Sequence, residues 1–85
     1  KTTVYITKNA LTIGILRVDA HVDDETGDAW VPVTGRKFPE FVRRLDVHRT
    51  LPPARERAEH LRVAKIQSLL KQIKKLETLS IKEMP

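Results

Sequence analysis

The hydrophobic positions in the last third of the chain follow the period of an α-helix. Stepping 100° per residue from Ala58 places a set of apolar side chains within an arc from about −60° to +80°. Thr50 suits the capping position, and Pro52 and Pro53 are tolerated in a first turn, where backbone N–H groups lack helical partners. The pattern therefore predicts one long amphipathic helix from Thr50 to about Leu79. Its apolar face consists of Ala54, Leu61, Ile66, Leu69, Ile73, Leu76 and Leu79.

The first part of the chain alternates between apolar and polar residues, as strands do. Thr2–Thr7 places Val4 and Ile6 on one face. A second strand is predicted to begin near Leu11, and its apolar phase changes beside Gly14, which predicts a β-bulge or a bend. The segment is then one bent strand or two short ones. The apolar positions before the change are Leu11, Ile13 and Ile15, and those after it are Leu16, Val18, Ala20 and Val22.

Two further segments have strand character, and turn-rich sequences separate them. Ala29–Thr34 is predicted to be a strand at a sheet edge, because Pro32 cannot donate a hydrogen bond to a neighbour. The segment 38–42 stays ambiguous, since Pro39 disfavours a regular helix there. Arg43–Arg49 is a candidate last strand, with Leu45 and Val47 directed inward.

These elements predict a single α+β domain over residues 1–85. A small antiparallel sheet of three to four strands occupies residues 1–49, the helix residues 50–79 and a tail residues 80–85. The helix is expected to run roughly 43 Å. A compact domain of this size has a diameter of only about 30 Å. The C-terminal turns must therefore project from the sheet or be covered by a second chain.

Two parts of the sequence resemble a group of short uncharacterised proteins of phages and bacterial mobile elements. The segment Val4–Ile15, with the sequence VYITKNALTIGI, resembles their N-terminal strand region. His48–Thr50, Arg57-Ala58 and Ala64–Leu76 resemble their helical C-terminus. In that group an acidic pair often follows the capping Thr, whereas this chain has Leu-Pro-Pro. The group has no established activity, so the resemblance implies a phage-like context and no particular chemistry.

The charge of the chain is concentrated in the predicted helix. The net charge is +5, and residues 51–85 hold eight Lys or Arg against four Asp or Glu. Between Glu59 and Glu77 there are five cations and no acid. A field of this kind predicts contact with nucleic acid or a nucleoprotein complex, and the alternatives are an acidic protein surface or a merely solvated face. The candidate contact residues are Arg43, Arg44, Arg49, Arg57, Lys71, Lys74 and Lys75.

Part of the apolar face has the spacing of a coiled-coil seam. Ile66, Leu69, Ile73 and Leu76 follow a 3-4-3 pattern, which extends over barely two heptads. Packing on the sheet explains such a stripe. The alternative function is self-association, in which the projecting turns of two copies form a homodimer.

The sequence gives little support to catalysis. The chain contains no Cys and lacks a glycine-rich phosphate loop, a nucleophile elbow and a zinc-protease spacing. His48 followed by Arg49 is a candidate acid/base and phosphate clamp, but a histidine at a strand end is the simpler interpretation. We therefore predict a protein that is not an enzyme, with no cofactor and no small-molecule substrate.

Three further expectations concern metal, membrane and core. Asp19, His21 and Asp23 share a strand face and would permit a metal site, but a surface histidine among acids is the simpler interpretation and we assign no metal. No apolar run approaches the ~20 residues that span a bilayer, so we expect a cytoplasmic protein without membrane contact. The aromatic residues are expected to serve at least partly in the core; they are Tyr5, Trp30, Phe38 and Phe41.

Overall fold

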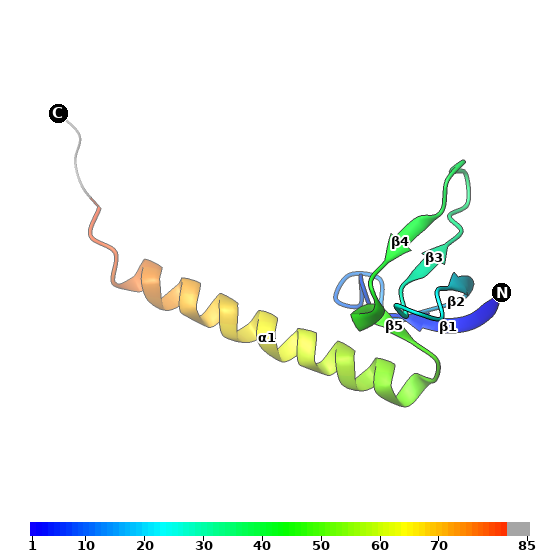
Figure 1. Cartoon of the computed structure of the whole chain (residues 1–85). Coiled ribbons are helices and arrows are strands. Elements are labelled where there is room, and N and C mark those ends of the chain that lie inside the picture. Colours follow the sequence, from blue (N-terminus) through cyan, green and yellow to red (C-terminus); the bar gives the residue numbers. More distant parts are fainter. Residues whose placement is uncertain (82–85) are drawn as a thin grey trace.

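The computed structural model describes residues 1–81 and has an α+β fold, in which a curled antiparallel sheet is followed by one long helix (Figure 1). The strands are β1 (Thr2–Ile6), β2 (Leu16–Val22), β3 (Ala29–Val31), β4 (Glu40–Val42) and β5 (Val47–His48). A 3₁₀ turn, η1 (Arg44–Asp46), precedes β5, and the helix is α1 (Leu51–Glu77). The strand order is β4-β3-β2-β1-β5, and every neighbouring pair is antiparallel. The predicted fold class is confirmed, with five strands instead of three or four.

The core of the sheet consists of small and medium-sized aliphatic side chains. Alternation in β1 and β3 directs Val4 and Val31 inward and leaves the intervening residues outside. Trp30 and Phe41 are each 43% exposed and Phe38 is 74% exposed. The expectation that these three aromatic residues serve the core is therefore wrong. The buried sheet residues are Val4, Ile6, Ala20, Ala29, Val31 and Val42.

The second strand begins later than its apolar pattern predicted. The chain between β1 and β2 forms successive turns, in which the N–H groups of both Thr12 and Ile13 donate to the carbonyl of Asn9. Gly14 has a φ of +86°, which an L-residue with a side chain adopts rarely, and it lies in this loop instead of within a bulged strand. Leu11 is consequently exposed. The alternation from Leu16 to Val22 is confirmed, because its odd-numbered residues are exposed and Ala20 is fully buried.

Pro32 and the segment before the helix have different roles from those predicted. β3 ends at Val31 and lies between β2 and β4, so Pro32 terminates an internal strand and does not mark a sheet edge. Most of the predicted strand Arg43–Arg49 is absent, because η1 turns the chain and leaves Leu45 62% exposed. Only the two residues of β5 pair with β1, through Tyr5↔His48 and Ile6↔Val47.

Helix α1 projects far beyond the sheet. It has 27 residues and spans about 40 Å, and the described structure measures 60 × 31 × 24 Å. Thr50 occupies the N-cap with an extended backbone, although its side chain makes no capping hydrogen bond. The predicted limits of residues 50–79 are thus correct within two residues. Of the predicted tail, residues 82–85 lie outside the described part of the chain.

We expect the substitution Val4→Ala to lower the free energy of unfolding by about 2 kcal/mol, because it removes two carbons from a fully buried position and leaves a cavity. The matched control is Leu45→Ala, at an apolar position of η1 that is 62% exposed. Urea denaturation followed by circular dichroism measures both. Equal effects of the two substitutions would contradict this account of the core.

Candidate functional site

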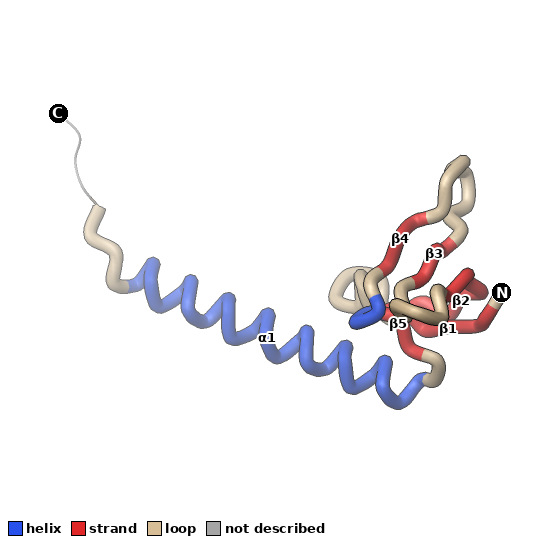
Figure 2. Tube along the Cα trace, viewed as in Figure 1, coloured by secondary structure: helices blue, strands red, loops and turns tan. Residues whose placement is uncertain are grey.

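The candidate site is the part of α1 that leaves the sheet. Ala54 is the one fully buried residue of the helix, and Arg57 and Leu61 are half-buried. Every residue from 62 to 81 is exposed. Figure 2 shows the same arrangement, since no other element lies beside the C-terminal half of the helix. The surfaces of this half are therefore available to a partner.

A polar cluster fixes the helix where it meets the sheet. The hydroxyl of Thr7, which is fully buried, donates to Asp46 Oδ1 at 2.9 Å and lies 3.0 Å from His48 Nε2. Because the single hydroxyl proton is used on Asp46, the geometry is that of an Nε2–H group donating to Thr7. Arg57 of α1 donates from Nε to the same Asp46 oxygen at 3.3 Å. The cluster joins the end of β1, η1, β5 and the helix.

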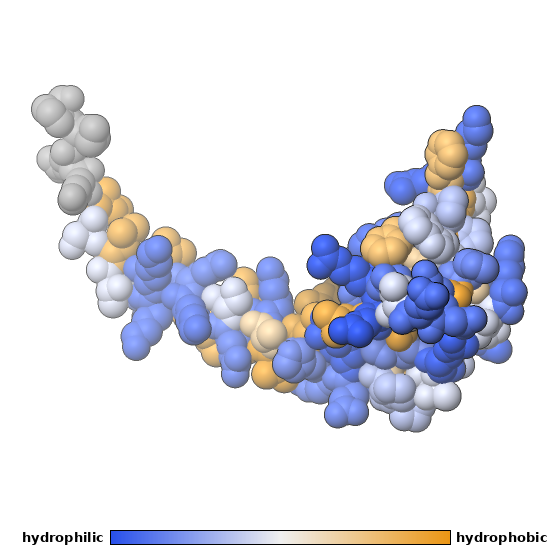
Figure 3. Space-filling view, in the orientation of Figure 1, coloured by the Kyte–Doolittle hydropathy of each residue, from blue (hydrophilic) through white to orange (hydrophobic). Residues whose placement is uncertain are grey.

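The apolar stripe of the projecting helix is wider than the predicted seam. Ile66 and Leu69 are 42% and 43% exposed, and Ile73 and Leu76 are 50% and 67% exposed. Val63 and Leu70 adjoin them on one side, at 40% and 59% exposure. These two residues lie outside the predicted seam, although Val63-Ile66-Leu70-Ile73 also follows a 3-4-3 pattern. We call these six residues the apolar stripe; Figure 3 shows apolar side chains between the polar ones along the helix.

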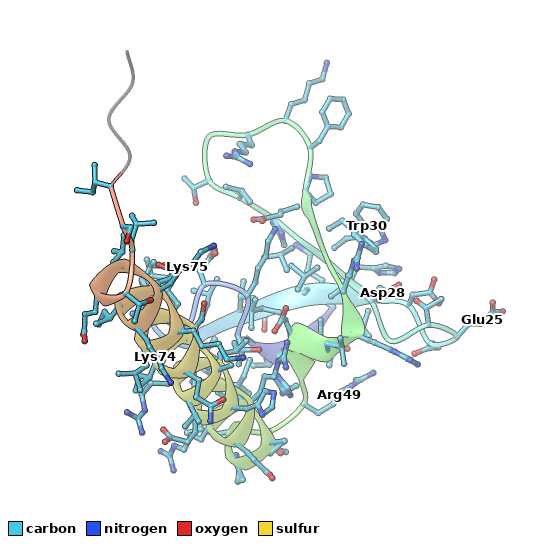
Figure 4. All side chains as sticks on the ribbon, turned by 90° about the vertical axis from the view of Figure 1, so that its left-hand side faces the viewer. Glu25, Asp28, Trp30, Arg49, Lys74 and Lys75 are labelled. Atoms are coloured by element: carbon cyan, nitrogen blue, oxygen red, sulfur yellow. The ribbon has the colours of Figure 1, made fainter. Side chains whose placement is uncertain are left out.

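Three lysines lie on the other side of the helix. Lys71, Lys74 and Lys75 fall within little more than one turn, and all three are exposed. Within residues 1–81 no acidic group lies within ion-pair distance of them. Figure 4 shows Lys74 and Lys75 on the last turns of α1. These three residues, the lysine cluster, form a compact cationic surface.

The remaining predicted cations do not join the lysine cluster. Arg57 is engaged with Asp46 at the sheet. Arg49 lies before the helix, and Figure 4 places it at the opposite end from Lys74. Arg43 and Arg44 are exposed at η1, where the backbone N–H of Arg44 donates to Asp28. Of the seven predicted residues, three form the lysine cluster, Arg43 and Arg44 are exposed at η1, Arg49 lies apart from them, and Arg57 is in an ion pair.

The acids of the β2 region have structural partners. Thr3 donates to Asp19 across the β1–β2 pair at 2.6 Å. The Asp23 carboxylate accepts from the N–H of Glu25 and closes the following turn. Among the described residues no group of three or more His, Asp or Glu side chains is arranged to hold a metal ion. The described part of the chain likewise has no helix long and apolar enough to cross a bilayer.

No protein-family model matches the chain, and neither a curated protein nor a solved structure is significantly similar to it. The resemblance to short phage proteins therefore stays a prediction.

His48 gives the anchor of the helix a pH dependence. Desolvation lowers the pKa of His48 from 6.5, the Arg57 charge lowers it further, and Asp46 opposes both. A histidine with a lowered pKa in the folded state binds its proton more readily when unfolded. The free energy of unfolding should therefore fall as the pH falls through 6.5 towards the lower pKa of the folded state, and be fully retained above 6.5.

The measurement is urea denaturation between pH 7.5 and pH 5 of the natural chain and of His48→Gln. We expect a smaller loss of stability in this range for His48→Gln. His21→Gln is the matched control, because His21 is exposed. If the free energy of unfolding of His48→Gln depends on pH as it does in the natural chain, the burial of His48 has no energetic consequence.

Proposed function

We propose that this chain is an interaction module that self-associates through the apolar stripe of α1. The sheet holds one end of the helix, and the projecting half pairs with the same half of a second copy. The observation that carries the proposal is that six large aliphatic side chains lie exposed on the part of α1 that projects beyond the sheet. Five of these residues are also at least 42% exposed.

The exposed segment needs a partner for energetic reasons. Most helical stability in proteins comes from packing of an apolar face, and the apolar face of this segment is exposed. Fully burying one large aliphatic side chain contributes about 1.5–3 kcal/mol. A second helix that covers the stripe would stabilise both the pair and the helical state of each member.

The charges around the stripe favour a second copy as the partner. With Ile66 and Ile73 at a positions and Leu69 and Leu76 at d positions, the lysine cluster occupies b, c and f, which face away from a paired helix. The positions that flank the seam hold one cation and one anion in each helix; they are Lys65, Leu70, Gln72 and Glu77. Two copies would therefore pair without net like charge at the seam.

We expect the natural chain to sediment as a dimer, with twice the monomer mass of 9.8 kDa, at high micromolar concentration. The double variant Leu69→Ser/Ile73→Ser should be monomeric and lose helical circular dichroism, because it removes two apolar contacts from each helix. Lys71→Ser/Lys74→Ser is the matched control, since it changes the same helical region on the other side. A natural chain that is monomeric at this concentration with full helix content would overturn the proposal.

The lysine cluster supports nucleic-acid contact as a second candidate function. Three cations that have no ion-pair partner among residues 1–81 lie within little more than one turn, and they can contact neighbouring phosphates of a duplex without reading its sequence. An acidic protein surface has the same charge and is the competing partner. Because the lysine cluster and the apolar stripe occupy different sides of α1, a dimer would keep the lysines exposed.

Fluorescence anisotropy with a labelled nonspecific duplex tests this second function. We expect Lys71→Glu/Lys74→Glu/Lys75→Glu to abolish binding. In Lys→Gln variants the slope of log K against log salt should fall by roughly 0.9 for each lost phosphate contact. The scattered variant Arg17→Glu/Arg49→Glu/Arg55→Glu has the same net charge and controls for nonspecific repulsion. If the two Glu variants lose duplex affinity to the same extent, the lysine cluster is not a defined binding site.

A further inference from the structure

The outer face of the sheet carries a row of ring side chains. Strand register places His21 of β2 opposite Trp30 of β3, and Trp30 opposite Phe41 of β4. The ring centroids of Trp30 and Phe41 are 4.9 Å apart, with planes inclined at 54°. Both rings contribute little to the core and keep 43% of their surface exposed. The row is therefore a half-open aromatic platform.

A cationic hollow adjoins this platform. It has a volume of about 300 Å³ and lies between Trp30 and the loop that joins β3 to β4. Its lining contains no acidic side chain among the described residues, and Pro32 and Pro39, at the two ends of the loop, restrict its backbone. Glu40, the acid that follows the loop, is paired with Lys8. Three cations line the hollow, namely Lys1, Arg36 and Lys37.

The acids near the platform lie on its other side. His21 and Trp30 also border a second hollow, whose remaining lining includes Asp23, Asp24 and Glu25. Figure 4 shows Glu25 beyond Trp30, at the right of the view, and it shows Lys74 and Lys75 at the left, on the last turns of α1. A polyanion on the platform would thus be repelled from the turn after β2 and drawn to the β3–β4 loop. The platform is spatially separate from the lysine cluster.

We propose that this face of the sheet binds single-stranded nucleic acid. One or two bases stack on Trp30 and Phe41, while the phosphates lie in the cationic hollow. Exposed aromatic rings beside a positive groove are the usual means of binding single strands, because every unpaired base offers a flat face. A duplex cannot bind in this way, since its bases already stack on each other. The inference is independent of the functions proposed for α1.

Trp30 is the only tryptophan of the chain, so its fluorescence reports directly on the platform. We would titrate the full chain at low salt with an oligothymidylate, with an oligouridylate and with a duplex of equal length. Saturable quenching by single strands, but not by the duplex, is expected. Comparison of the two single strands shows whether the platform binds DNA or RNA more tightly.

Variants separate stacking from charge and from the helix. Phe41→Ala should weaken single-strand binding on the order of tenfold, the effect of losing one stacked base. Arg36→Ala/Lys37→Ala should also weaken it several-fold, and the matched control Arg55→Ala/Lys65→Ala should not. The quenching should persist in Lys71→Glu/Lys74→Glu/Lys75→Glu, which separates this site from the lysine cluster.

Three results would overturn the proposal. The first is an absence of quenching by either single strand at low salt. The second is quenching that Phe41→Ala and Arg36→Ala/Lys37→Ala leave unchanged. The third is tighter, competitive binding of an acidic or proline-rich peptide, which would make the platform a peptide site.

Discussion

The arrangement of this molecule depends on a short contact that the first turns of α1 make with strands β1 and β5 and with η1. Ala54 is fully buried there, and Arg57 reaches the Asp46 carboxylate that also accepts from Thr7. The Arg57 and Asp46 side chains keep 28% and 22% of their surface, so solvent screens their attraction in part. Because the contact covers only the start of the helix, it sets the direction of α1 and leaves the later turns unsupported.

The small size of the core determines what the outer face carries. The inner positions of β2 and β3 include Ala20 and Ala29, and a curled sheet with such residues at its centre leaves little room for a ring. Trp30 therefore lies outside although its strand is internal in the sheet. An aromatic side chain that the core cannot accept gains its remaining burial from neighbours such as Phe41 or from a ligand. The aromatic platform thus follows from the same packing that stabilises the sheet.

The sequence predicted those features that local pattern controls. The limits of α1 follow from Thr50-Leu-Pro-Pro and from regular apolar spacing, and the alternation of β2 follows from its period of two. The turns before Gly14 could not be predicted, because Leu11 and Ile13 imitate a strand face while hydrogen bonds to Asn9 close a loop. The clustering of Thr7, Asp46, His48 and Arg57 joins residues up to fifty positions apart, and no local pattern encodes it.

The three candidate surfaces of this chain are compatible with one another in a single assembly. The apolar stripe and the lysine cluster occupy different sides of α1, and the aromatic platform lies on the sheet, away from both (Figure 4). Pairing of two stripes would bring two lysine clusters and two platforms into one complex. A polyanion held by one contact would then meet the others at a high effective concentration, which raises avidity without a new contact. In such a dimer, weak individual contacts to phosphates would be consistent with useful binding, provided that one strand reaches the contact surfaces of both copies.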